Sequence, residues 1–164
     1  ITAGSSVGVT VTNSDGATSG VYSMTVMGLP TGGTISIAGG YRIHTFTSSG
    51  NFIVPTGYSA TAEYLIAGGG GAGGDYFSGP GYNAAGGGGG AGGFISNLGS
   101  AVVLTSGTYS AVVGAAGVST ATTNSSGGYA SNGSNSSFNG YTAIGGGHGG
   151  AGNAAVSPLS LIHI

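Results

Sequence analysis

The chain of 164 residues has no cysteine, lysine or tryptophan and very few charges. Without cysteine it can form neither a disulfide framework nor a thiolate metal site. Its formally charged residues are Asp15, Arg42, Glu63 and Asp75, and the net charge is -2. A single arginine cannot neutralise a phosphate backbone, so we expect no nucleic-acid partner. The absence of lysine also excludes a Walker phosphate-binding motif.

Long apolar runs are also missing. No uninterrupted apolar stretch could span a membrane, and no basic segment followed by an apolar core marks a signal peptide, so we expect no membrane insertion. With so little charge, Ser, Thr, Asn and backbone amides must hydrate the surface, which suits an extracellular or particle-borne protein. The chain begins at Ile1 rather than methionine, and we expect it to be an internal fragment of a longer protein.

Glycine is present in excess, at 40 of the 164 positions. Much of it lies in three runs, at residues 68–74 (GGGGAGG), 86–93 (GGGGGAGG) and 145–152 (GGGHGGAG). Glycine carries the largest backbone entropy cost on folding, so ordered runs need a specific use. Either the runs are flexible linkers, or they are extended polyglycine II helices packed where any side chain would collide.

Side chains in and beside the runs recur every third residue, which is the period of such a helix. The residues in phase are Ala85, Ala91 and Phe94 around the second run, and His148 and Ala151 in the third. Two predicted strands, at residues 60–67 and 141–144, also lead directly into a run. Both observations favour packed helices in which glycine replaces an apolar core. We then expect valine at Gly70 or Gly147 to be far more damaging than any loop change.

Period-two alternation and many β-branched or aromatic residues predict a series of short strands. The expected strands are residues 7–12, 20–26, 34–37, 41–47, 51–54, 60–67, 94–98, 101–105, 108–113 and 141–144. No apolar stripe at helical spacing persists over two turns. We predict an all-β, irregular fold, in which a β-meander leads into a sandwich of polyglycine II-type helices and short strands. Residues 1–33 are interpreted as the end of a β module plus linker, and residues 34–158 as a glycine-rich domain.

Three segments carry a resemblance to a known family. They are GGYRIHTFTSSGNFIVPTG from residue 39, AEYLIAGGGGAGG from residue 62 and NSSFNGYTAIGGGHGG from residue 135. They resemble the glycine-rich domain of many phage and metagenomic proteins, and the architecture is similar to the receptor-binding tip adhesins of T-even-like phages. The resemblance implies a virion tail-fibre or particle-surface protein whose glycine helices hold receptor-contacting loops. His148 departs from the family pattern and is expected to face outward.

The last six residues, LSLIHI at 159–164, look like the translation of a sequencing-library adapter. We expect them to be an artefact, with the natural protein continuing differently after about Pro158.

The titratable residues form no recognisable catalytic set. Neither the histidines His44, His148 and His163 nor the three acids have the spacing of a nucleophile, base and orienting group. We therefore predict no enzyme activity, no cofactor and no metal. His44 lies within a predicted strand and is interpreted as a structural cross-strand partner. The first run matches GxGxxG, but the following DYFSGPG cannot open the helix that a dinucleotide site needs.

Two inserts between the runs carry the candidate binding residues. Residues 75–85 and 118–139 mix aromatic rings with Ser, Gly and Asn, the composition of binding paratopes. The candidates are Tyr76, Phe77, Tyr82 and Asn83 in the first insert, and Tyr129, Asn132 and Asn135 in the second. Aromatic faces with amide groups also suit sugars. The alternative is that both inserts are solvated loops that cap the glycine helices.

The residues and the resemblance together lead us to expect a non-enzymatic phage tail-fibre or particle-surface protein. It would reside in the virion or outside cells and attach to a host surface through the inserts. Its partners would be a bacterial surface receptor, either an outer-membrane protein or a glycan, and other tail-fibre subunits. One alternative is a glycine-rich extracellular or surface-layer protein of a bacterium with a structural role. Another is a fragment of a carbohydrate-processing enzyme.

Overall fold

A computed structural model describes residues 6–10, 12–25, 27–75, 77–79, 82–119 and 130–151. Within these residues the chain forms short strands in several small antiparallel sheets and no helix, which confirms the all-β, irregular class. In chain order, the strands are β1 (Ser6–Val9), β2 (Tyr22–Thr25), β3 (Thr34–Ala38), β4 (Tyr41–Thr45), β5 (Gly50–Val54), β6 (Ala60–Ala62), β7 (Leu65–Ala67), β8 (Phe77–Gly79), β9 (Tyr82–Ala84), β10 (Phe94–Ser96), β11 (Val102–Leu104), β12 (Gly107–Val112), β13 (Ser136–Phe138) and β14 (Tyr141–Ala143).

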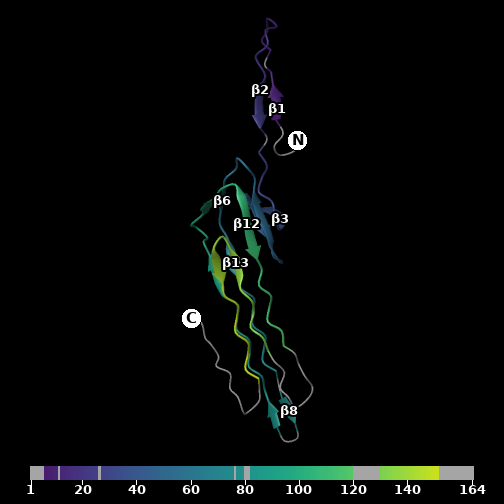
Figure 1. Cartoon of the computed structure of the whole chain (residues 1–164), viewed down its shortest axis with the longest axis vertical. Helices are drawn as coiled ribbons and strands as arrows, with labels where there is room; N and C mark the ends of the chain where they lie inside the picture. Colours follow the sequence, from purple (N-terminus) through teal and green to yellow (C-terminus); the bar gives the residue numbers. More distant parts are fainter. Residues whose placement is uncertain are drawn as a thin grey trace.

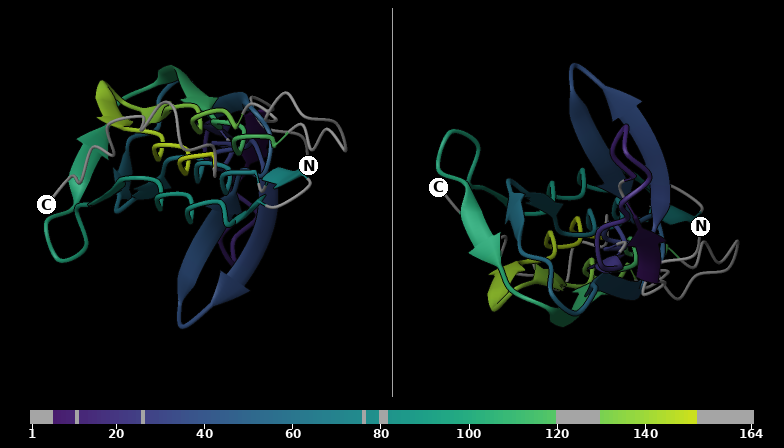
Figure 2. Two further views of the ribbon diagram at one scale, coloured as in Figure 1. Left: turned by 90° about the horizontal axis from the view of Figure 1, so that it is seen from below. Right: turned by 90° about the horizontal axis from the view of Figure 1, so that it is seen from above.

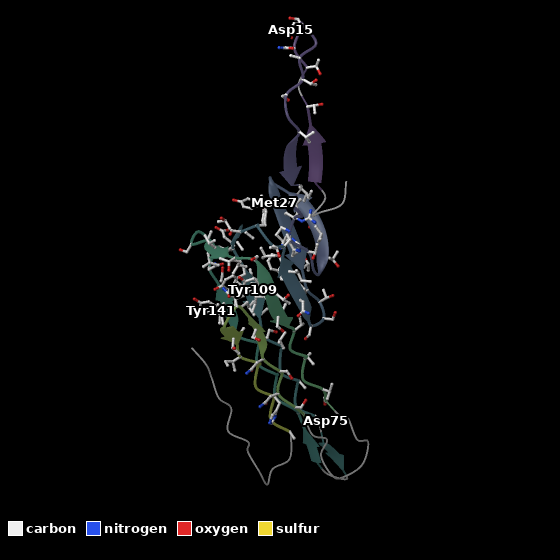
Figure 3. All side chains as sticks on the ribbon, turned by 45° about the horizontal axis from the view of Figure 1, so that its top comes forward. Asp15, Met27, Asp75, Tyr109 and Tyr141 are labelled. Carbon is white, nitrogen blue, oxygen red and sulfur yellow. The ribbon has the colours of Figure 1, made fainter. Side chains whose placement is uncertain are left out.

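The molecule is elongated, and the sheets and the glycine runs occupy different parts of its length (Figure 1). The β1–β2 hairpin lies at one end, beyond the sheets, and the β8–β9 hairpin lies at the other end, beyond the glycine runs. Side chains crowd around Tyr109 and Tyr141 and become sparse toward Asp75 (Figure 3). One half of the body therefore has an ordinary side-chain core, and the other half is built largely from backbone.

The largest sheet has four strands in the order β14–β13–β12–β5. Its strands β12, β13 and β14 are antiparallel neighbours in chain order, as expected for a meander, and β5 pairs with β12 over five residues. Alternate residues of β5, Phe52 and Val54, are buried, as period-two patterning requires. They pack with Ala60 and Leu104 to form the apolar core.

Aromatic rings surround Phe52 in this core. His44 meets it edge-on with ring centroids 4.9 Å apart, and Phe138 and Tyr109 lie at 6.1 and 6.5 Å, within the range of favourable aromatic pairs. The Nδ1–H of His44 donates to the carbonyl oxygen of Gly32 at 2.7 Å. These contacts support the structural role predicted for His44.

Tyr64 extends the aromatic cluster toward the surface. Its ring lies 5.8 Å from that of Phe138 and 5.6 Å from that of Tyr141. Desolvation raises the pKa of the Tyr64 phenol, and the hydrogen bond with Tyr141 adds to the effect. The Tyr64 ring therefore links Phe138 of the core to Tyr141 of β14.

Residues 60–67, predicted as one strand, form two. β6 pairs with β11 and β7 pairs with β10, so the chain passes from one two-stranded sheet to the next. At the break, the N–H of Tyr64 donates to Oδ1 of Asn97, and its carbonyl accepts from the N–H of Asn97. Asn97 therefore takes the bonds that a continuous strand would have made with a neighbour.

The three glycine runs lie side by side and hydrogen-bond at three-residue intervals. The first run donates to the second through Gly68 to Gly93, Gly71 to Gly90 and Gly74 to Gly87, at 2.7–2.9 Å. The second run donates to the third through Gly87 to Gly150, Gly90 to Gly147 and Gly93 to Ile144, at 2.6–2.8 Å. The third run donates back to the first through Gly146 to Gly69 and Gly149 to Ala72, both at 2.8 Å. This closed ring with a three-residue repeat is the arrangement of packed polyglycine II helices.

Two further segments complete the bundle, a fourth (residues 114–118) and a fifth (residues 131–135). The first run donates to the fifth through Gly69 to Ser134 and Ala72 to Ser131, and the fifth donates to the fourth through Ser134 to Ala115 and Ser131 to Val118. The fourth donates to the first through Gly117 to Gly70, and the fifth donates to the third through Gly133 to Gly146. The first run is therefore the central helix, with four neighbours. Figure 2 shows the five segments nearly end-on.

Glycine is required at some positions of each run and not at others. A Cβ at Gly68, Gly71 or Gly74 would lie 1.9–2.3 Å from a carbonyl oxygen of the third run or of Ile144 just before it, which no packing tolerates. By contrast, a Cβ at Gly70 would meet nothing nearer than 3.8 Å, and one at Gly147 would meet nothing within 4 Å. The expectation that these two positions are the sensitive ones is therefore wrong, because both lie in the outward-facing phase of the repeat.

Candidate functional site

The glycine bundle brings the β8–β9 hairpin of the first insert, and Ser119 and Ala130 of the second, to its end remote from the sheets, which we call the distal end. The first and second runs are joined there by the β8–β9 hairpin, directly beyond the hydrogen bond from Gly74 to Gly87. The residues that flank the undescribed part of the second insert, Ser119 and Ala130, pair in an isolated β-bridge. Ser131, next to this bridge, is bonded to Ala72, within one turn of Gly74. Two segments far apart in sequence thus leave the bundle at the same end.

The first insert was expected to be a loop, and the structure forms it into a hairpin. β8 and β9 are antiparallel, with Phe77 opposite Ala84, Ser78 opposite Asn83 and Gly79 opposite Tyr82. Three of the four candidates in this insert, Phe77, Tyr82 and Asn83, therefore lie on paired strands. Tyr76 lies outside the described residues.

In the second insert, the two asparagine candidates support the scaffold. The backbone N–H of His148 donates to Oδ1 of Asn132, and that of Gly145 donates to Oδ1 of Asn135, both at 2.9 Å. The two asparagines are three residues apart, and so are their partners Gly145 and His148. The amide oxygens therefore follow the three-residue repeat of the third run. These bonds use only the oxygens, and the amide nitrogens are not part of them. The remaining candidate, Tyr129, lies outside the described residues.

His148 interrupts the third run without breaking it. Its side chain is exposed, as expected, and its Nδ1–H donates to the carbonyl oxygen of Gly149 at 3.0 Å. Asp75 is half-buried where the first run ends. Among the described residues, no three His, Asp or Glu side chains come together as metal ligands. In the same residues, no helix is long and apolar enough to cross a membrane.

Two shallow hollows lie outside the distal end. One of about 260 Å³ follows the β4–β5 turn around Thr47 and Ser48, and one of about 400 Å³ lies beside Tyr109 and Phe138. Both are lined by hydroxyl, amide and aromatic groups, and neither has a charged side chain in its lining. Neither hollow therefore presents a pair of carboxylates or a histidine for acid–base chemistry.

The residues in the bundle match a known sequence family. A model of the glycine-rich domain covers residues 45–160, which is more than half of the chain. The chain belongs to the glycine-rich domain family. The matched part of this glycine-rich domain starts at the end of β4 and includes all three runs and both inserts. A search among curated proteins and one among solved structures found no similar protein.

Serine hydroxyls complete the hydrogen bonding of the glycine-rich domain, a role the sequence did not reveal. The N–H of Gly114 donates to Oγ of the buried Ser136, and that of Val118 donates to Oγ of Ser131, both at 2.9 Å. The N–H of Val113 likewise donates to Oγ of Ser49 at 3.0 Å. A polyglycine helix has no internal hydrogen bonds, so its backbone N–H groups need other acceptors. Serines close to the glycine-containing segments were therefore the sequence signal for this role.

Proposed function

We propose that the chain is a non-enzymatic phage tail-fibre or particle-surface protein that attaches to a host surface through the distal end. The observation that carries the proposal is that the β8–β9 hairpin of the first insert and the flanks of the second insert, Ser119 and Ala130, lie at the same end of the bundle. Tyrosine, phenylalanine and asparagine on a preorganised scaffold bind with little loss of conformational entropy. A bacterial outer-membrane protein or a surface glycan is the partner that this composition fits, and the site would be in the virion or outside the cell.

The bundle itself supports a display role. Five backbone segments are cross-bonded at three-residue intervals, so the first insert emerges from a support with little freedom to move. The distal end also lies opposite the β1–β2 hairpin (Figure 1), which leaves the N-terminal end for attachment to other fibre subunits. The scaffold and the contact residues would then be separate parts of one chain.

Adsorption of the purified protein to bacterial cells tests this proposal. Replacing Tyr76, Phe77 and Tyr82 together by alanine is expected to weaken adsorption at least about tenfold, the loss of 1.4 kcal/mol or more that aromatic anchors commonly supply. The matched control is Phe94→Ala, because Phe94 is an exposed aromatic residue at the sheet end of the second run. Equal adsorption by wild type and the triple variant would contradict the proposal and favour a purely structural role.

A further inference from the structure

The β3–β4 hairpin projects from the body as a two-stranded ribbon. Its strands pair over five residues, and Gly39 and Gly40, with φ of 57° and 81°, form the turn between them. In both views of Figure 2 this ribbon extends sideways beyond the sheets and the glycine bundle. A hairpin of two strands has little stability of its own in water. A ribbon that leaves the body is therefore a candidate for contact with a partner.

The outer edge of β3 carries hydrogen-bonding groups that face no neighbouring strand. In a hairpin with a two-residue turn, the pair next to the turn is hydrogen-bonded, and bonded pairs then alternate with unbonded ones. Counted from the Ala38–Tyr41 pair, the N–H and C=O groups of Ile37 and Ile35 point away from β4. Among the described residues, β3 pairs with β4 alone, and all five of its residues are exposed. This exposure shows that the edge is accessible.

β3 carries none of the features that usually keep an exposed edge from pairing. Such features are charged side chains, proline and bulges, and the five residues of β3, TISIA, are uncharged and pair with β4 without a bulge. β4 differs, because it carries Arg42, the single arginine of a chain without lysine. The ring of its His44 also packs against Phe52 of the core. Of the two strands, β3 is therefore the one suited to pairing.

Two copies of the β3 edge are complementary to each other in antiparallel register. When Ser36 lies opposite Ser36 of a second copy, Ile35 of each copy lies opposite Ile37 of the other. These are the residues whose N–H and C=O groups point outward, so each such pair exchanges two hydrogen bonds, as in any antiparallel ladder. Donors meet acceptors because the two-fold axis reverses the direction of the second strand.

The same register also brings apolar side chains together. Ile35 and Ile37 lie on one face of β3, because alternate residues of a strand share a face. Ile37 is 76% accessible and would be covered by Ile35 of the second copy, which is a favourable cross-strand pair. The tip of each ribbon comes beside the base of the other, where Gly39 and Gly40 bring no side chains that could collide. Backbone and side chains therefore favour one arrangement.

We propose that β3 pairs antiparallel with β3 of a second copy, so that two ribbons form one four-stranded sheet in the order β4–β3–β3–β4. The contact uses the same patch on both copies, as a two-fold symmetric dimer does. The outer edges of this sheet are the β4 strands, whose Arg42 opposes further addition, so assembly stops at two copies. This inference does not rest on the proposed function, because the ribbon belongs to the sheet half of the molecule and not to its distal end.

Sedimentation velocity of the full chain across the micromolar range tests the pairing. Wild type is expected to shift from monomer to dimer with rising concentration. Ile37→Pro should raise the dimer dissociation constant at least about tenfold, because proline removes an outward N–H and its ring obstructs the edge, while the bonds to β4 remain. Arg42→Pro is the matched control and should dimerise as wild type does, since Arg42 lies opposite Ile37 and its N–H points to the other edge.

Cysteine cross-linking tests the register independently of the proline variants. The chain has no cysteine, so a single one introduced on β3 can bridge only two copies. Ser36→Cys should form a disulfide-linked dimer on mild oxidation, because the two Cα atoms of an unbonded antiparallel pair lie about 4.5 Å apart. Thr34→Cys is the matched control on the same exposed face. Its two copies would be offset by four residues, roughly 13 Å along the strands, and should not link.

Three outcomes would overturn the proposal. The first is a wild-type protein that remains monomeric over the whole concentration range. The second is a dimer that Ile37→Pro leaves intact, or that Arg42→Pro weakens as much, since the β3 edge would then not be the contact. The third is cross-linking of the Thr34→Cys variant as readily as the Ser36→Cys variant, which would exclude the register. Thermal unfolding of both proline variants checks that they fold.

Discussion

At the scale of single residues, the backbone that lies beside each glycine of a run decides whether a side chain can replace it. Among the described residues, none of the glycines in the three runs has a positive φ. Conformational freedom therefore does not explain them. What they supply is space at particular positions, because a Cβ at Gly69, Gly71 or Gly146 would lie 2.0–2.2 Å from a neighbouring carbonyl oxygen, whereas one at Gly88 or Gly147 would meet nothing within 4 Å.

These contacts predict opposite effects for the same substitution at two glycines. Gly71→Ala should lower the free energy of unfolding by about 3 kcal/mol or more, because its Cβ would lie 2.0 Å from the carbonyl oxygen of Gly147 and the helices must separate. Gly147→Ala should raise that free energy by about 0.5 kcal/mol, because alanine restricts the unfolded chain without a clash. Urea denaturation followed by circular dichroism measures both. Equal effects would show that the runs do not pack as described.

At the scale of elements, the sequence predicted the strands that have period-two alternation and β-branched residues. Predicted strands at residues 34–37, 51–54 and 108–113 correspond to β3, β5 and β12 within one or two residues, because alternation and β-branched residues mark half-buried strands. The three-residue spacing likewise pointed to packed runs. The phase that faces outward could not be read from it, because that depends on which neighbour lies on which side.

The fourth and fifth segments were missed because they are not rich in glycine. Only every third residue must lack a side chain, and Gly114, Gly117 and Gly133 meet this need. Alanine, serine, valine and asparagine fill the other positions, so the composition resembles that of a loop. β13 was missed because its composition also resembles that of a loop. The hairpin signal was Asn139-Gly140 between β13 and β14, where φ is 48° and 83°.

Of the candidate site, the sequence located the two inserts but not the roles of all their residues. The asparagines at 132 and 135 were predicted to bind, and the structure shows their oxygens bonded to the third run. Sequence alone could not reveal this, because the run and the asparagines meet only when the fifth segment packs antiparallel to the third. Whether the aromatic residues bind a receptor stays a prediction.

The contribution of these asparagine bonds, which link the fifth segment to the third run, to stability can be tested. Asn135→Ala should lower the free energy of unfolding by about 1 kcal/mol, because the half-buried N–H of Gly145 loses its acceptor. Asn132→Ala should cost less, since the N–H of the exposed His148 can bond to water instead. Urea denaturation measures the free energies of unfolding, and hydrogen exchange at the Gly145 amide reports its bond to Asn135 directly. Asn135→Asp is the control that retains the oxygen, and a loss equal to that of alanine would contradict the assignment.

At the scale of the whole molecule, the stable scaffold and the proposed recognition site occupy different parts of the chain. The apolar core around Phe52 and Val54 and the backbone-packed bundle are continuous with each other through β7, β10, β12 and β14, each of which is next to a bundle segment in sequence. The β8–β9 hairpin stands beyond both (Figure 1). A two-stranded hairpin adds little stability of its own, so the distal end is free to vary without loss of the fold.

Because the β8–β9 hairpin lies apart from the scaffold, the result of exchanging the whole first insert can be predicted. Replacing residues 76–84 by a Gly/Ser segment of equal length should change the free energy of unfolding by less than about 1 kcal/mol, because the loop that closes the first and second runs keeps its length. Adsorption to host cells should fall to background in the same variant. Urea denaturation and the cell-binding assay measure the two quantities on one sample. Collapse of the bundle would show that the hairpin is part of the scaffold, whereas undiminished adsorption would place recognition elsewhere on the chain.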